Sequence, residues 1–581
     1  MKEGSSLVSK YAVLWFSILL VLGVSYLLLH ELPFATNGLL QEHYDQYRVA
    51  IHSSYAELFR SLFSFKTQMM HDVLNTKFEE HRLFQISWRP VFFLYYKVMY
   101  DCFGLNTFIP FLIRYLHFVA IVSILYLLLY DITQRVGLAF FCAMLYFFSP
   151  GHWVEDYWLV TVRTTMALSI MLVGIFWSKV MVDIDHKIIS KKKFIFYYFI
   201  LFFVFYFLGR LRDLIITAPL AIGIYALYQC IKKKWPWRNK KIQFNVLLTV
   251  PVGVLQCIHT YFHDFPAAPS TIPRYKTFWR LFYLGSGYSF DELPAGGFLF
   301  SLKNYFPASL LGNLGPYVVW VLVVALVGGG ILYIFKKPSF NFQAKIKPFS
   351  SYLISFFICW FLAELVMLSL GDQLRHASTA VVPLVFLVGV VFYYVIDYFK
   401  RYAGSVSVVF SCLLGLTLFM NIEHIKFFHR LYLGRTMLTS RINEFIYHEA
   451  VPILEQTQID FYENLFYKVG KTNQLVPNIM IIYNKRDYAY FSDFGDAFAS
   501  FYTKEELSQF IQKVRGKGFP KIFVVTPDAS VLSWVSSIEG ARLIKDTEIT
   551  SATHDFLGRH YEKKRKNGKV WIGVVELDKK T

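Results

Sequence analysis

The stretch MKEGSSLVSKYAVLWFSILLVLGVSYLLLHELPF, residues 1–34, decides the class of fold, because it joins a basic start to a long apolar run. An apolar run of about 20 residues is long enough for a helix to cross a bilayer. No small-residue cleavage site follows this run, so we interpret it as a retained signal anchor and not as a removed signal peptide. The chain is therefore predicted to enter the membrane with its first helix.

The composition of the whole chain favours the same class. Hydrophobic residues make up 55% of the 581 residues and charged residues only 17%, whereas globular domains carry roughly 25% charged residues. A net charge of +19 would suggest nucleic acid as the partner of a soluble protein. In a membrane protein the positive-inside rule explains such an excess of lysine and arginine. We therefore predict the lipid bilayer, and no nucleic acid, as a partner.

Apolar segments recur along the first 422 residues and predict about eleven membrane spans. The segment 90–105 is also apolar but carries Lys97 and Asp101, so we predict a helix that lies in the membrane interface. The predicted spans lie near residues 11–30, 107–130, 136–150, 156–182, 194–209, 213–231, 243–263, 315–335, 350–371, 378–398 and 405–422.

The positions of the lysine clusters predict how the spans are oriented. If the N-terminus is cytoplasmic, alternate threading places HKIISKKK (186–193), KKKWPWRNKK (232–241) and KKPSFNFQAKIK (336–347) on the cytoplasmic side. Clusters of this kind are typical of cytoplasmic loops. The opposite, outer face then receives a first long loop at 31–106, a second at 264–313, and everything after about residue 423.

The segment 423–581 differs from the rest in composition. It contains the β-branched stretches NIMIIYN (478–484), KIFVVTP (521–527) and KVWIGVVEL (569–577), with the amphipathic stretch KEELSQFIQKVRGKG (504–518) between the first two. A helix between two buried-type strands favours a βαβ unit. The predicted fold class is thus mainly α: residues 1–422 form a polytopic transmembrane helical bundle, and residues 423–581 a small extracytoplasmic α/β domain.

Ionisable side chains gather at the predicted outer ends of the spans. Glu42 and Asp45, in QEHYDQYR (41–48), are spaced so that they can share one face of a helical turn. Carboxylates suit proton abstraction or metal binding, and arginines suit phosphate recognition, so the set predicts a transferase with a phosphate-linked donor. The alternative is that these charges only anchor the spans at the membrane surface. The later members of the set are His152, Glu155, Asp156, Arg163, Arg210, Arg212, Asp213, Arg375 and His376.

The order of these features resembles the GT-C superfamily of polytopic glycosyltransferases, which use polyprenyl-phosphate-linked sugars. The likeness extends to protein-mannosylating, TMTC-like and bacterial members, covers roughly residues 11–422 and leaves the C-terminal segment unassigned. The stretches that carry it are EHYD (42–45), SWRPVFFLYYKVMYDCFGLN with the helix that follows (87–129), YFFSPGHWVEDYWLVTVRTTMALSIML (146–172), GRLRDLIITAPLAI (209–222) and DQLRHASTAVVPLVFL (372–387).

The resemblance implies a catalytic role for the acids of the first loop. Asp45 matches the acid that takes the proton from an acceptor hydroxyl in an inverting displacement, and Glu42 is the next candidate. The two carboxylates could also hold a divalent ion, Mg²⁺ or Mn²⁺. The family has both metal-dependent and metal-independent members, and EHYD does not decide between them.

The resemblance also implies roles for residues elsewhere in the chain. Arg375 and Arg212, with His376, would bind the donor phosphate. A secondary acidic or acceptor site would include His152 and one of the two acids Glu155 and Asp156. Trp88 and Arg89 would support the first loop structurally.

Taken together, the sequence predicts a membrane glycosyltransferase of the hexosyl- or pentosyltransferase class, acting on the non-cytoplasmic face. The sugar would pass from a polyprenyl-phosphate carrier to an acceptor hydroxyl on a glycan, lipid or protein, or to a lipid-linked glycan. The alternatives are a transporter or flippase, and a non-catalytic assembly component. A transporter is expected to show internal repeats and charges near the bilayer midplane, whereas here the charges lie chiefly at helix ends, with Glu364 as the main exception.

The predicted compartment is the bacterial inner membrane, with a cytoplasmic N-terminus and the C-terminal domain outside. The sequence contains no N-x-Ser/Thr acceptor site, and long outer loops in the endoplasmic reticulum often carry such sites.

Overall fold

The structure is a computed structural model, and the elements and contacts below concern the residues it describes. The chain divides into two compact units, and each is considered by itself: residues 1–27, 113–156 and 161–426, and residues 28–112, 157–160 and 427–581. The described residues are 2–26, 49–50, 53–63, 83, 85–103, 108–148, 162–186, 190–211, 217–232, 239–262, 347–369, 378–398, 445, 479–484, 498–501, 503–516, 521–526, 528–550, 553–554, 560–561 and 569–578.

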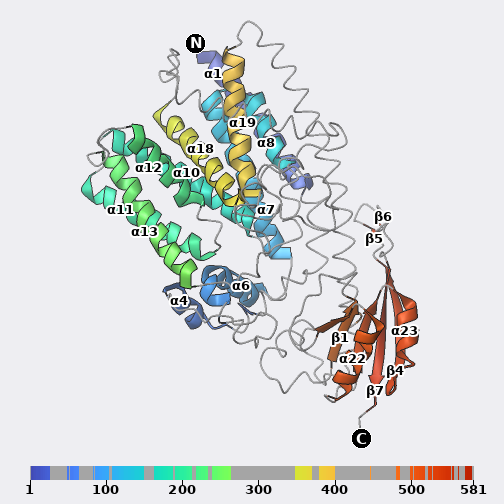
Figure 1. Ribbon diagram of the computed structural model, residues 1–581. Helices are drawn as coiled ribbons and strands as arrows, with labels where there is room; N and C mark the ends of the chain where they lie inside the picture. Colours follow the sequence, from blue (N-terminus) through green and yellow to red (C-terminus); the bar gives the residue numbers. More distant parts are fainter. Residues whose placement is uncertain are drawn as a thin grey trace. The chain divides into compact units, whose positions relative to one another are not determined.

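The first unit is a bundle of apolar helices (Figure 1). Each predicted span coincides with a described helix, except the spans near 315–335 and 405–422, which lie outside the described residues. The helices are α1 (Lys2–Tyr26), α7 (Phe108–Thr133), α8 (Val136–Phe147), α10 (Arg163–Asp185), α11 (Lys191–Leu211), α12 (Thr217–Lys232), α13 (Lys240–Phe262), α18 (Pro348–Ser369) and α19 (Ser378–Tyr398).

Length and hydropathy separate these helices into two groups. Within the described residues, four stretches are long and apolar enough to cross a membrane: Phe108–Thr133, Thr164–Asp185, Lys191–Leu211 and Thr379–Ile396. The apolar parts of α1, α8, α12 and α18 are shorter. The mainly helical membrane fold is therefore confirmed, while the number of about eleven spans stays a prediction.

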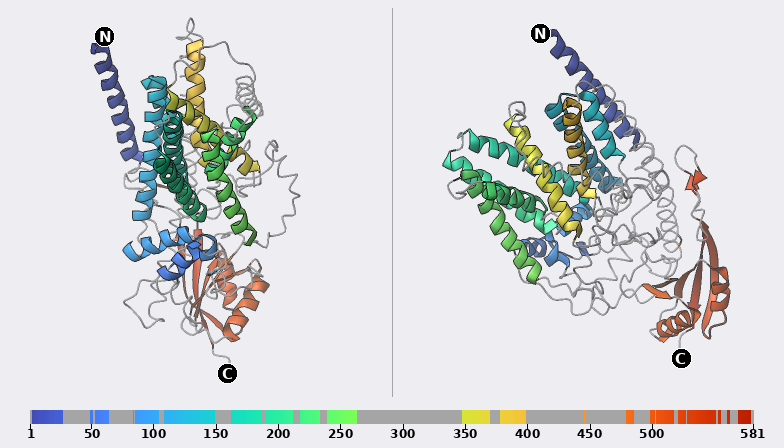
Figure 2. Two further views of the ribbon diagram at one scale, coloured as in Figure 1. Left: turned by 90° about the vertical axis from the view of Figure 1, so that its left-hand side faces the viewer. Right: turned by 45° about the horizontal axis from the view of Figure 1, so that its top comes forward.

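Aromatic and small residues bring the helices of the bundle together. Trp177 of α10 and Trp360 of α18 are fully buried. At Gly174 the two helices approach so closely that an added Cβ would lie 2.4 Å from the ring of Phe356. The α18 and α19 helices are joined by stacking of Phe357 on Phe386, with ring centroids 3.9 Å apart. Figure 2 shows these helices side by side in two further views.

Polar contacts show which helix ends meet. At one end of the bundle, Lys347 at the start of α18 contacts Asp131 near the end of α7, with Nζ and Oδ1 2.8 Å apart. Here too the last residue of α10, Asp185, forms an ion pair with Lys241 at the start of α13. We call this the lysine end, defined by Asp131, Asp185, Lys241 and Lys347.

Two further contacts join the opposite halves of α7, α10 and α18 and the start of α19. His117 of α7 contacts Thr165, near the start of α10, at 2.9 Å. Glu364 of α18 contacts Thr379, near the start of α19, at 3.0 Å. We call this the Glu364 end, defined by these four residues. Thus α7 and α10 run from the Glu364 end toward the lysine end and α18 runs the opposite way, while the side of the membrane that each end faces stays a prediction.

In the second unit, α4 (Tyr55–Phe63) packs against α6 (Pro90–Phe103). Ser54 and Glu57 form a capping box before α4: the Ser54 backbone N–H donates to Glu57 Oε2 at 2.8 Å, and the Glu57 N–H donates to Ser54 Oγ at 3.2 Å. A hydrogen bond to Asp101 of α6 raises the pKa of Tyr55. Cys102 beside it is exposed, whereas Cys142 and Cys359 of the bundle are buried. The predicted helix at 90–105 is therefore present, and its place in the membrane interface stays a prediction.

The C-terminal part of the second unit is an α/β fold, as predicted. A five-stranded sheet has the order β2-β1-β3-β7-β4, in which β1 is parallel to β2 and β3, and β7 is antiparallel to β3 and β4. The predicted βαβ arrangement is confirmed, because α22 follows β1 and β2 and precedes β3. The elements are β1 (Ile479–Asn484), β2 (Phe498–Phe501), α22 (Lys504–Gly516), β3 (Lys521–Thr526), α23 (Ala529–Val535), β4 (Ala541–Thr550), β5 (Thr553–His554), β6 (His560–Tyr561) and β7 (Lys569–Leu577).

Alternation along the strands explains how the helices cover this sheet. Ile522 and Val524 of β3 lie on one face, where they meet Leu507 of α22 and Leu532 of α23 in one apolar cluster. Both helices therefore lie on the same face of the sheet (Figures 1 and 2). The boundary predicted at residues 422 and 423 stays a prediction.

Candidate functional site

Most of the predicted site residues lie outside the described part of the chain. These are Glu42, Asp45, His152, Glu155, Asp156, Arg212, Arg375 and His376. Trp88 and Arg89 are described, and the Arg89 guanidinium lies over the Trp88 ring, with Cζ 3.4 Å from the ring centroid. This stacking comes immediately before α6, and its predicted role in supporting the first loop stays a prediction.

Sequence continuity connects three of the predicted segments to one end of the bundle. Residues 149–161 join α8 to α10, residues 212–216 join α11 to α12, and residues 370–377 join α18 to α19. The flanking termini are those of the Glu364 end, because α10 and α19 begin there and α18 ends there. The α11 helix also ends toward it, because Tyr197 near its start contacts Asp183 near the other end of α10. The described side chains at this end are therefore where a candidate site can be examined.

The most deeply buried acid at this end is Glu364, which is only 2% exposed. Its Oε1 accepts a hydrogen bond from Trp360 Nε1 at 2.9 Å, one turn earlier in α18. Its Oε2 accepts a hydrogen bond from Thr379 Oγ1 of α19 at 3.0 Å. An ionisable group in an apolar helix is costly to insert and most often marks a functional region. The sequence analysis noted Glu364 as an exception but assigned it no role.

A second polar pair at the same end joins α7 to α10. His117 Nδ1 and Thr165 Oγ1 lie 2.9 Å apart, and which atom donates depends on the histidine tautomer. Thr164, beside Thr165, is 4% exposed. The start of α10 thus presents two consecutive hydroxyl groups inside the bundle, and one of them contacts an imidazole that can accept or donate a proton.

Two buried arginines also lie toward the Glu364 end, one near the start of α7 and one near the end of α11. Arg114 of α7 is 9% exposed, and Arg210 of α11 is 2% exposed. The guanidinium of Arg210 lies 5.6 Å from the ring centroid of Tyr206. Guanidinium groups inside a membrane protein suit the recognition of phosphate. Arg114 lies within the apolar segment 107–130, but the sequence analysis did not consider it, because the sequence does not show that this side chain is buried.

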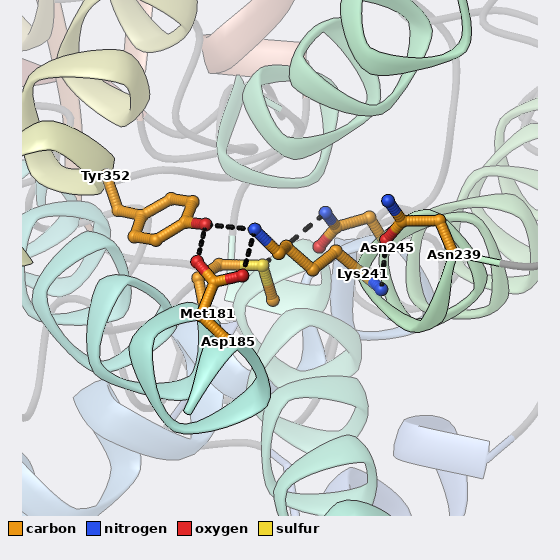
Figure 3. Close-up of polar contacts among 6 residues, drawn as sticks. All are labelled: Met181, Asp185, Asn239, Lys241, Asn245 and Tyr352. Atoms are coloured by element: carbon orange, nitrogen blue, oxygen red, sulfur yellow. Dashed lines mark hydrogen bonds and ion pairs between the residues drawn. The ribbon is translucent and has the colours of Figure 1, made fainter. Parts of the chain in front are cut away.

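The lysine end has a different chemistry (Figure 3). Lys241 contacts both Asp185 and Tyr352, and the Tyr352 hydroxyl donates a hydrogen bond to Asp185, so that three helices meet in one cluster. Deeper in the bundle, Asn245 accepts a hydrogen bond from Trp177 Nε1 at 2.9 Å. These groups neutralise one another, which is the behaviour expected of contacts that hold helices together.

The predicted divalent ion cannot be placed from these side chains. Its possible ligands, Glu42 and Asp45, lie outside the described residues. In the part of the chain that the structure describes, no group of three or more His, Cys, Asp or Glu residues is arranged to hold a metal ion.

The comparisons with known proteins give one distant likeness. No family model and no curated protein matches the chain. Among solved structures, the chain is similar to the crystal structure of ArnT from Cupriavidus metallidurans bound to undecaprenyl phosphate. The alignment covers 97% of this chain and 98% of that chain, with 12% sequence identity and a TM-score of 0.41. A likeness this distant assigns neither family nor function, so the function is argued from the residues of this chain.

Proposed function

We propose that this chain is a membrane glycosyltransferase of the GT-C type that moves a sugar from a polyprenyl-phosphate-linked donor to an acceptor hydroxyl or a lipid-linked glycan. The observation that carries the proposal is the presence of three buried ionisable side chains toward the Glu364 end, namely Glu364, Arg114 and Arg210. The segments with the predicted donor-binding and secondary acidic residues continue from the helix termini of this end. Such groups are costly in a membrane unless they serve a polar ligand or partner.

The proposed reaction is an inverting displacement at the anomeric carbon of the sugar. Asp45 accepts the proton of the acceptor hydroxyl while the acceptor oxygen forms a bond to the anomeric carbon. The bond from that carbon to the phosphate oxygen breaks, and the electron pair leaves with the polyprenyl phosphate. A positioned base contributes roughly 10²–10⁴-fold to such a step. Glu42 is the second candidate for the base.

Cationic side chains would stabilise the phosphate as it leaves. Arg375 and Arg212, with His376, are the proposed donors of hydrogen bonds to its oxygens. His152, Glu155 and Asp156 are proposed to form the secondary acidic or acceptor site. A divalent ion held by Glu42 and Asp45 would supply a further positive charge. The proposed setting is the non-cytoplasmic face of a bacterial inner membrane.

The proposal is tested by replacing the proposed base with its neutral isostere. Membranes that contain the Asp45→Asn variant should transfer sugar roughly 10²–10⁴-fold more slowly than the wild type, because the amide cannot accept the proton. The measurement is the release of polyprenyl phosphate from a panel of radiolabelled polyprenyl-phosphate hexoses and pentoses, with a lipid extract as acceptor.

Asp185→Asn is the matched control, because it makes the same chemical change at the lysine end and should leave transfer unchanged. Undiminished transfer by Asp45→Asn would remove Asp45 from the role of base. Movement of an intact lipid-linked glycan across the membrane, without cleavage of the donor, would instead identify the chain as a flippase.

A further inference from the structure

The carboxylate of Glu364 ties the beginning of α19 to α18. Its bond to Trp360 lies within α18 and fixes the orientation of the carboxylate, with Nε1 and Oε1 2.9 Å apart. Its other oxygen accepts from Thr379 at 3.0 Å and so holds the neighbouring helix. Glu364 and Thr379 are both 2% exposed, so water does not compete for these bonds.

The first turn of α19 lacks one backbone hydrogen bond, the one that the Thr379 carbonyl would accept. Pro383 lies inside α19, four residues after Thr379. Proline has no N–H and cannot donate the helical hydrogen bond to the carbonyl of the residue four positions earlier. The side-chain bond from Thr379 to Glu364 therefore supports a turn that has one helical bond fewer than usual.

In the sequence, residues 370–377 connect α18 to this first turn of α19. Those residues include Arg375 and His376, which we proposed as ligands of the donor phosphate. We infer that Glu364 is a positioning residue: by holding Thr379 it sets the start of α19, and with it the attachment of the segment that binds the donor phosphate. The inference deepens the proposed function and rests on its donor-binding residues.

The choice of a carboxylate supports this role. An apolar side chain of similar size would pack in a helical bundle without the cost of inserting an acid. Leucine, however, cannot accept either hydrogen bond. The apolar contact of Phe357 with Phe386 would then remain between the two helices, and such a contact allows α19 to shift along α18. Two directional bonds to one carboxylate define the position of α19 in a way that apolar contact does not.

The experiment measures the binding of a sugar-free polyprenyl phosphate, undecaprenyl phosphate, to the full chain in lipid nanodiscs. Thr379→Val removes the hydroxyl without changing the size of the side chain, and should raise the Kd about three- to tenfold. Thr379→Ser keeps the hydroxyl and should bind like the wild type. Arg375→Ala is the reference for loss of a direct phosphate ligand.

Two control variants remove hydroxyl groups elsewhere in the bundle. Tyr352→Phe removes an interhelical hydroxyl from the other end of α18. Thr249→Val makes the same change as Thr379→Val where the hydroxyl bonds only within its own helix, to the Asn245 carbonyl at 2.8 Å. Both should leave the Kd unchanged, even where they lower the thermal stability, because neither acts on the start of α19.

Two replacements of Glu364 separate its hydrogen bonds from its charge. Glu364→Gln can bond to both Trp360 and Thr379 and should bind like the wild type, while Glu364→Leu should weaken binding as Thr379→Val does. Wild-type affinity in Thr379→Val would overturn the positioning role. Equal losses in Glu364→Gln and Glu364→Leu would also overturn it, because the charge would then be what matters.

Sugar transfer measured on the same preparations separates the two proposals. A wild-type chain that transfers sugar, beside a Thr379→Val variant of unchanged affinity and transfer, overturns only the inference about Glu364. A wild-type chain that binds undecaprenyl phosphate but transfers no sugar overturns only the proposed transferase. A wild-type chain that binds no undecaprenyl phosphate overturns both.

Discussion

The two ends of the helix bundle are held together by opposite kinds of polar contact. At the lysine end the partners are charged and partly exposed: 37% of the Asp185 side chain and 21% of the Lys241 side chain are exposed. At the Glu364 end the partners are deeply buried, with Glu364 and Thr379 each 2% exposed. One end resembles the surface of a soluble protein, and the other places polar groups where a membrane protein normally has none.

This difference separates anchoring from function. Exposed ion pairs contribute about 0–1 kcal/mol each, and lysines at such a position are expected from the positive-inside rule alone. Buried polar groups are costly to insert, and stability does not require them, because apolar residues of similar size would serve as well. The Glu364 end therefore has polar groups that stability does not explain, which is why we proposed this end for the reaction.

The largest effect is expected from a substitution that disturbs both ends of the bundle at once. Gly174 lies on α10 between the two ends, and a Cβ there would lie 2.4 Å from the Phe356 ring of α18. Gly174→Ala should push the helices apart and lower the free energy of unfolding by about 1–3 kcal/mol. Thermal unfolding of the purified protein in detergent measures this loss, and the affinity for undecaprenyl phosphate should fall with it.

The control for Gly174→Ala is Gly253→Ala in α13. A Cβ at Gly253 would meet nothing within 4 Å, so this variant should be neutral or stabilised by about 0.5–1 kcal/mol through the better helix propensity of alanine. Equal stability of the two variants would contradict the close approach of α10 to α18.

A smaller effect is expected from a substitution at the lysine end. Asp185→Asn weakens the pair with Lys241 and should lower the free energy of unfolding by about 0–1 kcal/mol. Because salt screens exposed charges, the difference from the wild type should shrink as ionic strength rises. Thermal unfolding at low and high salt measures the difference, and loss of sugar transfer would contradict an anchoring role for this end.

The parts of the fold that the sequence could predict are those specified by local patterns. Long apolar runs mark the helices of the bundle, and β-branched runs mark β1, β3 and β7. We missed β4 because charged residues such as Lys545, Asp546 and Glu548 interrupt its apolar pattern, as is typical of an edge strand. The predicted span at 156–182 also begins too early, since α10 starts at Arg163.

The contacts of the candidate site depend on how distant helices are aligned, which no local pattern contains. Glu364 and Thr379 are fifteen residues apart in the chain, and their contact depends on how α18 and α19 pack against each other. His117 and Thr165 are separated by forty-eight residues. The sequence predicted ionisable groups at helix ends, but the pairing of the side chains required the three-dimensional arrangement.

The distribution of thiols has a practical consequence for the orientation of the chain. Cys102 of α6 is exposed, whereas Cys142 and Cys359 are enclosed by the bundle. A membrane-impermeant maleimide added to intact cells should therefore modify Cys102 if α6 faces outward, and the part of the modification that is lost in Cys102→Ser belongs to this thiol. Modification of Cys102 only after the cells are broken would reverse the predicted orientation. The native sequence thus already contains the chemical label needed to find which face of the membrane α6 occupies.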